Sequence, residues 1–430
     1  MARELTTEIT FDHTHQMRRV REYGYNRERT IYLRFTRESN GESFFVQAWG
    51  SAFPEDGGGG YQGRIANTGR SVEAAIDIVR SEWQRQVVDY HELVDGRKRH
   101  PFVDSVDLAG AADRQHLEAI GIELARAGDT LFWALFGDPG MEEITTLLRG
   151  ALRAGEHVIT AESDTLFAPW GLLYTSPRED ERLVGPGAGW SMDGFWGYRH
   201  LVEHNFSRTP GFDSRIHVRG GQVMAGLNVD QGVDEEHPPT PFIAPVIRFF
   251  RERTTTVVRA SKDELAHALT ASPFDDHITY FGCHAEVSGA GGGQPEPPYL
   301  ALGDKKQIRG VELIGWLSQR HGRLLPNRPL VFVSACQGGQ LCSRFYGAFG
   351  RDLLQHGARC LLGPQIDLPR MFAAEYTTRL FSALLEPGTR LGDVVRALAR
   401  EFADDHRNPL GLIFSLYRGL DVHFGPRDAW

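Results

Sequence analysis

The sequence has few cysteines, no long apolar run and no excess of basic residues. Four cysteines in 430 residues, none in a Cys-x-x-Cys pair, exclude a disulfide framework, which needs more cysteines in a much smaller chain. The longest apolar stretches, at 330–333 and 410–416, fall far short of the roughly 20 residues of a membrane helix. The first residues, MARELTTEITFDH, lack the apolar core of a signal peptide. We therefore expect a cytoplasmic protein with free thiols.

Cofactor and nucleic-acid signals are also lacking. A formal net charge of −9 at pH 7 argues against non-specific nucleic-acid binding, which normally needs a basic protein. Histidine and cysteine pairs at 13–15 and 283–284 lack the spacing of a zinc site. The glycine run at 57–60 is not followed by the Gly-Lys-Ser/Thr of a phosphate loop. We expect no metal, no cofactor, no nucleic-acid partner and no membrane, and the charge leaves a protein substrate open.

The pattern of apolar and turn residues in the N-terminal part of the chain predicts a small α+β unit. Apolar residues alternate along 31–35 and 44–48 on either side of Asn40-Gly41, a pattern typical of a β-hairpin. The spacing of apolar residues predicts an amphipathic helix over 69–89. Because the charged segment 95–100 precedes a proline, we predict a linker there. The chain is long enough for two domains, which we predict as an accessory domain over 1–100 and a larger domain over 101–430.

The larger domain shows an alternation of strands and helices. We predict strands at 157–160, 223–229, 254–259, 277–282, 329–334 and 358–363. We predict helices at 114–127, 141–154, 242–251, 262–270, 309–319, 343–356, 371–385 and 391–404. Such alternation implies parallel strands joined by crossover helices. The predicted fold class is therefore α/β, a mainly parallel sheet with helices on both faces.

Two of these apolar strands run directly into a reactive side chain. ITYFGCH ends at His284, and LVFVSAC ends at Cys336, which Gln-Gly-Gly follows. Catalytic groups gather at the carboxyl ends of parallel strands, so these two residues emerge side by side if their strands are neighbours. A thiol near its ordinary pKa of about 8.5 is mostly protonated at pH 7, and a neighbouring imidazole removes that proton. We predict Cys336 as nucleophile and His284 as general base.

The residues around the cysteine fit this chemistry. Small glycines let a substrate carbonyl approach, and the main-chain N–H of Gly338, with that of Cys336, is a candidate for the oxyanion hole. Ala-Cys-Gln-Gly at 335–338 matches the end of the caspase signature, whose histidine lies about 50 residues upstream. Here the separation is 336 − 284 = 52 residues. Ser334 stands where the signature has glutamine.

Structural roles are the competing interpretation for each residue alone. A cysteine after a core strand is usually a small buried hydrophobe, and a histidine at a strand end usually has a structural partner. The pair, at this spacing and with flanking glycines, favours catalysis. We interpret Cys283, Cys342 and Cys360 as structural, and we expect Cys283 to point to the opposite face of its strand from His284.

The sequence resembles the CHAT domain, a caspase-like relative of the separases and of peptidases attached to some CRISPR effectors. The resemblance covers roughly 106–424 and is carried by FGCHA at 281–285, VSACQ at 333–337, PWGLLY at 169–174 and the segment 357–363. Two residues depart from the family pattern. Ala285 replaces a glycine whose N–H contributes to the oxyanion hole, a role that alanine retains, and Gly171 replaces a glutamate in a block that we interpret as structural.

This resemblance implies a caspase-like endopeptidase that acts on a protein substrate through an acyl-enzyme. It further implies a place in bacterial defence, where relatives cleave a single effector protein. Because a cytoplasmic peptidase must be kept from digesting its host, we expect regulation by an activating protein or ligand that acts through the N-terminal domain. Asp367 falls where the separase pattern has an acidic residue, which implies cleavage after Arg or Lys. A solvated loop aspartate explains Asp367 equally well.

Two alternatives stay open at this point. An inactive caspase-like scaffold that binds a partner would keep the same fold, and an unassembled oxyanion hole leaves no trace in a sequence. A different cysteine-dependent acyl transferase or hydrolase would use the same two residues.

Overall fold

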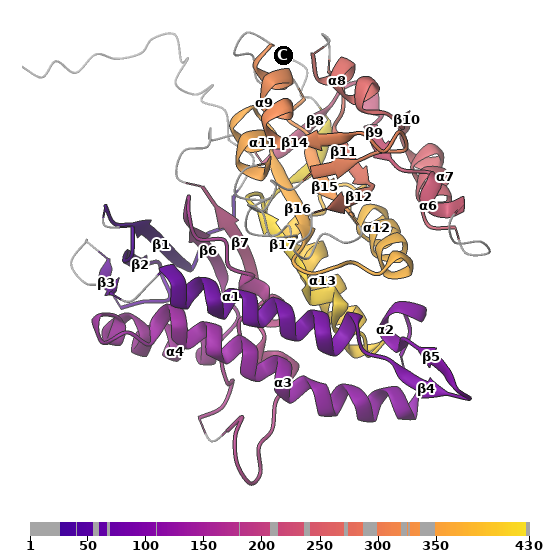
Figure 1. The fold of residues 1–430 in the computed structure, drawn as a ribbon. Helices are drawn as coiled ribbons and strands as arrows, with labels where there is room; N and C mark the ends of the chain where they lie inside the picture. The colour runs from indigo at the N-terminus through magenta and orange to yellow at the C-terminus, as the bar shows by residue number, and fades with distance from the viewer. Residues whose placement is uncertain are drawn as a thin grey trace, which may run out of the picture.

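The centre of the molecule is one long twisted sheet. The computed structural model describes residues 26–39, 41–54, 60–66, 69–108, 110–179, 181–206, 214–235, 241–270, 274–286, 299–319, 325, 327–335 and 349–426. Within these ranges eleven strands lie in the order β10-β9-β11-β15-β16-β17-β7-β6-β1-β2-β3. Figure 1 shows the sheet running through the whole molecule, from the N-terminal strands to the C-terminal half.

The C-terminal half of the sheet is parallel. Its strands are β10 (Thr255–Arg259), β9 (Met224–Val229), β11 (Ile278–Gly282), β15 (Leu330–Val333) and β16 (Cys360–Pro364). β17 (Phe414–Tyr417) then pairs with β16 in the antiparallel direction. The strands β11, β15 and β16 are buried along their whole length, which explains their continuous apolar runs.

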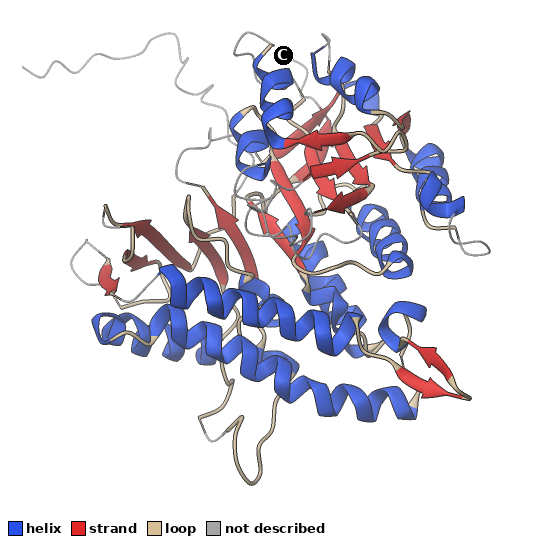
Figure 2. Ribbon diagram, in the orientation of Figure 1, coloured by secondary structure: helices blue, strands red, loops and turns tan. Residues whose placement is uncertain are grey.

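Helices cover both faces of this half, as Figure 2 shows. On one face lie α7 (Ile243–Arg253) and α12 (Arg370–Leu384), whose Phe250 and Phe381 pack near Tyr280 and Phe332 of the strands. The other face carries α8 (Lys262–Thr270), α9 (Gly310–Ser318) and α11 (Arg351–Gln355) over a second apolar cluster. The predicted α/β fold with helices on both faces is confirmed.

The N-terminal half continues the same sheet. β7 (Leu201–Asn205), β6 (Val158–Glu162) and β1 (Ile31–Arg37) are parallel, and β2 (Phe44–Trp49) and β3 (Tyr61–Ile65) follow in antiparallel order. The predicted hairpin is confirmed, although Asn40 lies outside the described residues. Because β1 pairs with β6, the residues before and after 100 are joined by main-chain hydrogen bonds. The division of the chain at 100 stays a prediction.

Three long helices lie along one side of this half (Figure 1): α1 (Gly69–Trp83), α3 (Ala111–Phe136) and α4 (Glu142–Ala154). A π-helical turn, η2 (Gln84–Val88), continues α1, so the helix predicted over 69–89 is confirmed.

None of the helices in the described ranges is both long and apolar enough to cross a membrane.

The segment 95–100 is part of a hairpin instead of the linker that its charge indicated. β4 (Glu92–Val94) and β5 (Arg97–Arg99) pair across Asp95 and Gly96, both of which have positive φ. Asp-Gly is favoured in such two-residue turns because glycine adopts positive φ without steric cost. The turn signal was present in the sequence, next to a run of charges.

The remaining elements are short, apart from one C-terminal helix. They are α2 (Pro101–Asp104), η3 (Pro139–Met141), η4 (Trp170–Leu172), η5 (Met192–Gly194), α5 (Trp196–Arg199), β8 (Arg215–Val218), η6 (Arg219–Gly221), α6 (Gly232–Glu235), β12 (His284–Glu286), β13 (Tyr299–Ala301), β14 (Gln307–Arg309), α13 (Leu391–Asp404), η9 (Pro409–Leu412) and β18 (His423–Pro426). β12, β13 and β14 form a small separate sheet, and β8 pairs with β18.

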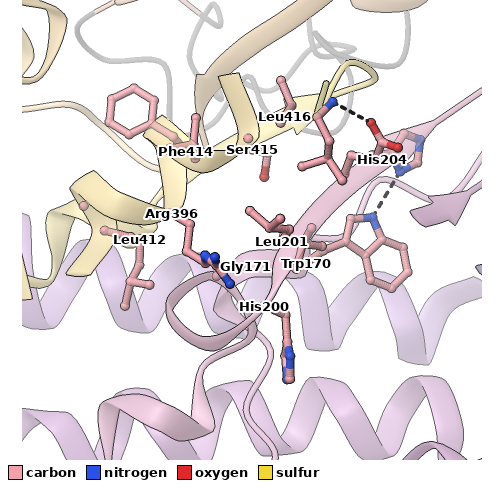
Figure 3. Close-up of a pocket in the computed structure, with 18 residues that line it drawn as sticks. Trp170, Gly171, His200, Leu201, His204, Arg396, Leu412, Phe414, Ser415 and Leu416 are labelled. Carbon is pink, nitrogen blue, oxygen red and sulfur yellow. Dashed lines mark hydrogen bonds between the residues drawn. The ribbon is translucent and has the colours of Figure 1, made fainter. Parts of the chain in front are cut away.

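The Pro-Trp block at 169–174 is buried where the two halves of the sheet meet. The Trp170 indole N–H donates to Nδ1 of His204 over 3.1 Å (Figure 3). Nε2 of His204 donates to the Ser163 carbonyl over 2.9 Å. Burial lowers the pKa of His204 to about 4. The imidazole is therefore neutral in the folded protein at neutral pH.

We expect this histidine to make the protein acid-sensitive. Its pKa is about 4 in the fold against 6.5 in the unfolded chain, so the unfolded chain binds a proton first as the pH falls. The stability is complete above pH 6.5 and is lost between pH 6.5 and 4, by about 2 kcal/mol at pH 5. Urea unfolding of the wild type and of His204→Gln at pH 7.5 and pH 5 measures this loss. An equal pH dependence in the two proteins would contradict the assignment.

Candidate functional site

The two strands that carry the predicted catalytic residues are neighbours in the sheet. β11 and β15 are parallel, with Phe281 opposite Val333, and the Ser334 N–H donates to the Phe281 carbonyl over 2.8 Å. His284 therefore follows one strand at the same edge at which the other strand ends. Cys336 and Gly338 lie outside the described residues. The two strands are neighbours, as a contact between Cys336 and His284 requires. The contact itself stays a prediction.

Two of the other cysteines are buried in the core. Cys283 is 3% exposed and belongs to the apolar cluster on the face of α8, α9 and α11, opposite the face where Tyr280 packs. Cys360 is also fully buried, and burial raises the pKa of its thiol to about 12. These surroundings keep both thiols protonated or inaccessible, as expected for structural cysteines. Cys342 lies outside the described residues.

A buried carboxylate that the sequence analysis missed holds His284. Asp230 directly follows β9, the neighbour of β11 on its other side, and its side chain is fully buried. Its Oδ2 lies 3.2 Å from Nε2 of His284. The main chain supports the contact, because the Asp230 N–H donates to the Gly282 carbonyl over 2.9 Å. The signal was available: an apolar strand that ends in an acidic residue follows the same rule that singled out His284 and Cys336.

Asp230 has two further partners. Its Oδ1 accepts the N–H of Gly232 over 3.0 Å, and Nζ of Lys305 lies 2.5 Å from Oδ2. Lys305 is half-exposed and reaches the carboxylate from the turn after β13. A buried carboxylate needs such partners, since an unpaired charge is costly in the protein interior.

This geometry sets the state of the imidazole. A carboxylate that faces Nε2 favours the proton on that nitrogen, which leaves the lone pair on Nδ1. His284 can then accept a proton at Nδ1 while Asp230 holds the ring and balances the positive charge that develops on it. A base oriented by a carboxylate is one arrangement that supports nucleophilic catalysis.

Two further predicted site residues, Ala285 and Asp367, lie in the described part of the chain. Ala285 lies in β12 opposite Leu300 of β13, one residue beyond His284. Asp367 follows β16, and its main-chain N–H donates to Oε1 of Gln84 at the end of the N-terminal helix over 3.1 Å. Their roles in the oxyanion hole and in substrate binding stay predictions. Among the described residues, no group of three or more acidic, histidine or cysteine side chains is arranged to hold a metal ion.

Residues 229–411 match the family model of the CHAT domain. Among solved structures, the chain is similar to separase in the Saccharomyces cerevisiae separase–securin complex at 2.6 Å resolution, with a TM-score of 0.46, 9% identity, and coverage of 92% of this chain and 30% of that chain. For the same complex at 3.0 Å resolution the TM-score is 0.35, the identity 8%, and the coverage 80% and 22%.

The chain thus spans less than a third of the length of these separase chains. A comparison with curated protein sequences gives no match. The family match begins one residue before Asp230 and includes the segments of both His284 and Cys336. The resemblance inferred from the segments of His284 and Cys336 is confirmed as a match to the CHAT-domain family model over residues 229–411.

Proposed function

We propose that this chain is a cysteine endopeptidase that cleaves a protein substrate, with Cys336 as nucleophile and His284 as general base. The observation that carries the proposal is the 3.2 Å contact between His284 and the buried Asp230, at the edge of the sheet where β15 ends three residues before Cys336. A structural histidine at a strand end does not need a dedicated buried carboxylate behind it. Such a carboxylate orients the ring of a general base and balances the positive charge that develops on it.

The proposed reaction proceeds in two halves. Nδ1 of His284 takes the proton of the Cys336 thiol, the sulfur attacks the substrate carbonyl, and the C–N bond breaks as the imidazolium protonates the leaving amine. Water then gives a proton to His284 and attacks the thioester, which releases the acid and restores the thiol. The main-chain N–H groups of Ala285 and Gly338 are the proposed donors to the oxyanion.

Asp230 acts in both halves as a positioning residue. It keeps the Nε2 proton in place and stabilises the imidazolium, and it does not itself accept a proton. The amide of Gly232 and the Lys305 ammonium fix the carboxylate in turn. This support is the kind that orients a catalytic group without touching the substrate.

Regulation by a protein or ligand is part of the proposal, because a peptidase with a free active site would digest its host. The N-terminal residues contact the segment after β16: Arg80 of α1 donates to Oε1 of Gln365 over 2.8 Å, and Gln84 accepts from the Asp367 N–H. A binding event on α1 would therefore reach this segment. A role in bacterial defence follows from the CHAT resemblance alone.

A preference for a basic residue before the cut depends on Asp367. A hollow lies beside the ends of β11 and β15. The residues that line it include Arg370 but not Asp367. A basic preference therefore has no support from the described contacts.

We expect a peptidyl electrophile to label the wild-type protein at Cys336 and not to label Cys336→Ala. His284→Ala is expected to react at least about 100-fold more slowly, because no base then removes the thiol proton. Intact-protein mass spectrometry measures both. Cys360→Ala, which removes a buried thiol that does not line the hollow beside the strand ends, serves as the control and retains labelling. A wild type that no peptidyl probe labels would favour the inactive scaffold.

We expect Asp230→Asn to lower kcat by about 100-fold with little change in KM, because the substituted amide no longer enforces the Nε2 proton. The melting temperature, measured in parallel, distinguishes this effect from unfolding. Asp263→Asn is the matched control, since Asp263 is an exposed aspartate of α8. A kcat within about threefold of the wild type would show that Asp230 has no positioning role.

A further inference from the structure

A hollow opens beside the ends of β11 and β15, on the face that α7 and α12 cover. Its unfilled space, including the open mouth, is about 310 Å³. Gly282, Cys283 and Ser334 form its base at the strand ends. Apolar side chains form most of its wall: Val233, Phe242, Ile243, Tyr280, Ala373 and Ala374.

Among the residues that the structure describes, two polar groups in this hollow lack hydrogen-bond partners. Nη1 of Arg370, at the first residue of α12, is buried and has no hydrogen-bond partner, and neither has the buried hydroxyl of Ser334. In the part of the chain that the structure describes, no carboxylate forms an ion pair with Arg370. Leaving a buried donor unsatisfied costs about 1–3 kcal/mol, and more for a charged group. Such groups in a native protein therefore indicate a missing ligand or solvent.

The position of the hollow indicates which part of a substrate enters it. Ser334 stands two residues before Cys336, and Gly282 stands two residues before His284. If Cys336 attacks a peptide carbonyl, the nearest substrate side chain is that of the residue immediately before the cut. This step rests on the proposed function.

We propose that the hollow binds the side chain before the cut and selects Asp or Glu there. A carboxylate satisfies the Arg370 guanidinium, which binds carboxylates in a planar, two-pronged geometry, and it accepts a further hydrogen bond from the Ser334 hydroxyl. The apolar wall holds the methylene groups and excludes water, which strengthens the ion pair. A Lys or Arg side chain would bring a second positive charge to Arg370, and Leu would leave the guanidinium unsatisfied.

The test is a set of fluorogenic peptides that differ only in the residue before the cut: Asp, Glu, Asn, Gln, Leu and Arg. We expect kcat/KM for Asp or Glu to exceed that for the matching amide by at least about 10-fold, because only the charged form pairs with Arg370. The same residues placed in a peptidyl electrophile report the preference by the rate of Cys336 labelling.

Variants locate the effect in the hollow. Arg370→Gln is expected to reduce cleavage after Asp or Glu by at least about 10-fold, and to reduce it more than cleavage after Asn or Gln. Arg370→Glu is expected to shift the preference toward Lys and Arg. Ser334→Ala, which removes only a hydroxyl, gives a smaller loss and serves if the Arg370 variants do not fold. Arg251→Gln is the matched control, because it removes the same charge from the exposed end of α7.

Two outcomes would overturn the inference, and they are distinguishable. Cleavage or labelling that is faster with Arg, Lys or Leu before the cut than with Asp or Glu would support the peptidase and overturn the acidic preference. Absence of both cleavage and labelling with every peptide overturns the peptidase and the acidic preference together.

Discussion

A buried carboxylate at the carboxyl end of β9 connects the parts from which the candidate site is built. Asp230 binds the main chain of Gly282 at the end of β11, the imidazole of His284 and the ammonium of Lys305. A charge in this position is stable only if all of these partners are present, because burial removes its hydration. The orientation of the histidine and the packing of the turn after β13 therefore depend on one side chain.

Two charged groups beside this sheet differ in how fully their hydrogen bonds are satisfied. Glu203 of β7 is buried but accepts hydrogen bonds from Thr160, Arg29 and the main chain at 419–420. Arg370, beside the ends of β11 and β15, keeps a buried nitrogen without a partner. In the proposed binding hollow, a substrate carboxylate would supply the partner that this nitrogen lacks among the described residues.

Elements that depend on one local pattern of residues could be predicted from the sequence. Continuous apolar runs predicted the buried parallel strands, and two of them led to His284 and to the segment of Cys336. It failed where structure depends on distant partners: β17 is a short strand inside a longer apolar run, and its place between β16 and β7 is set by tertiary pairing. Asp230 was visible as a strand-end carboxylate. The role proposed for Arg370 could not be predicted from the sequence. Whether a side chain lacks a hydrogen-bond partner depends on the packed core and not on a local pattern.

The segment between β16 and α12 links the N-terminal helices to the proposed binding hollow. Gln365 and Asp367 bind α1 and its π-helical end, and Arg370 follows three residues later at the start of α12. In a short chain segment fixed at both ends, a shift at one end displaces the other, since packed interiors transmit strain. The same few residues therefore face the sheet edge on one side and the N-terminal helices on the other. If the proposed activator acts on α1, its effect reaches the start of α12, and with it the proposed binding hollow, through this segment.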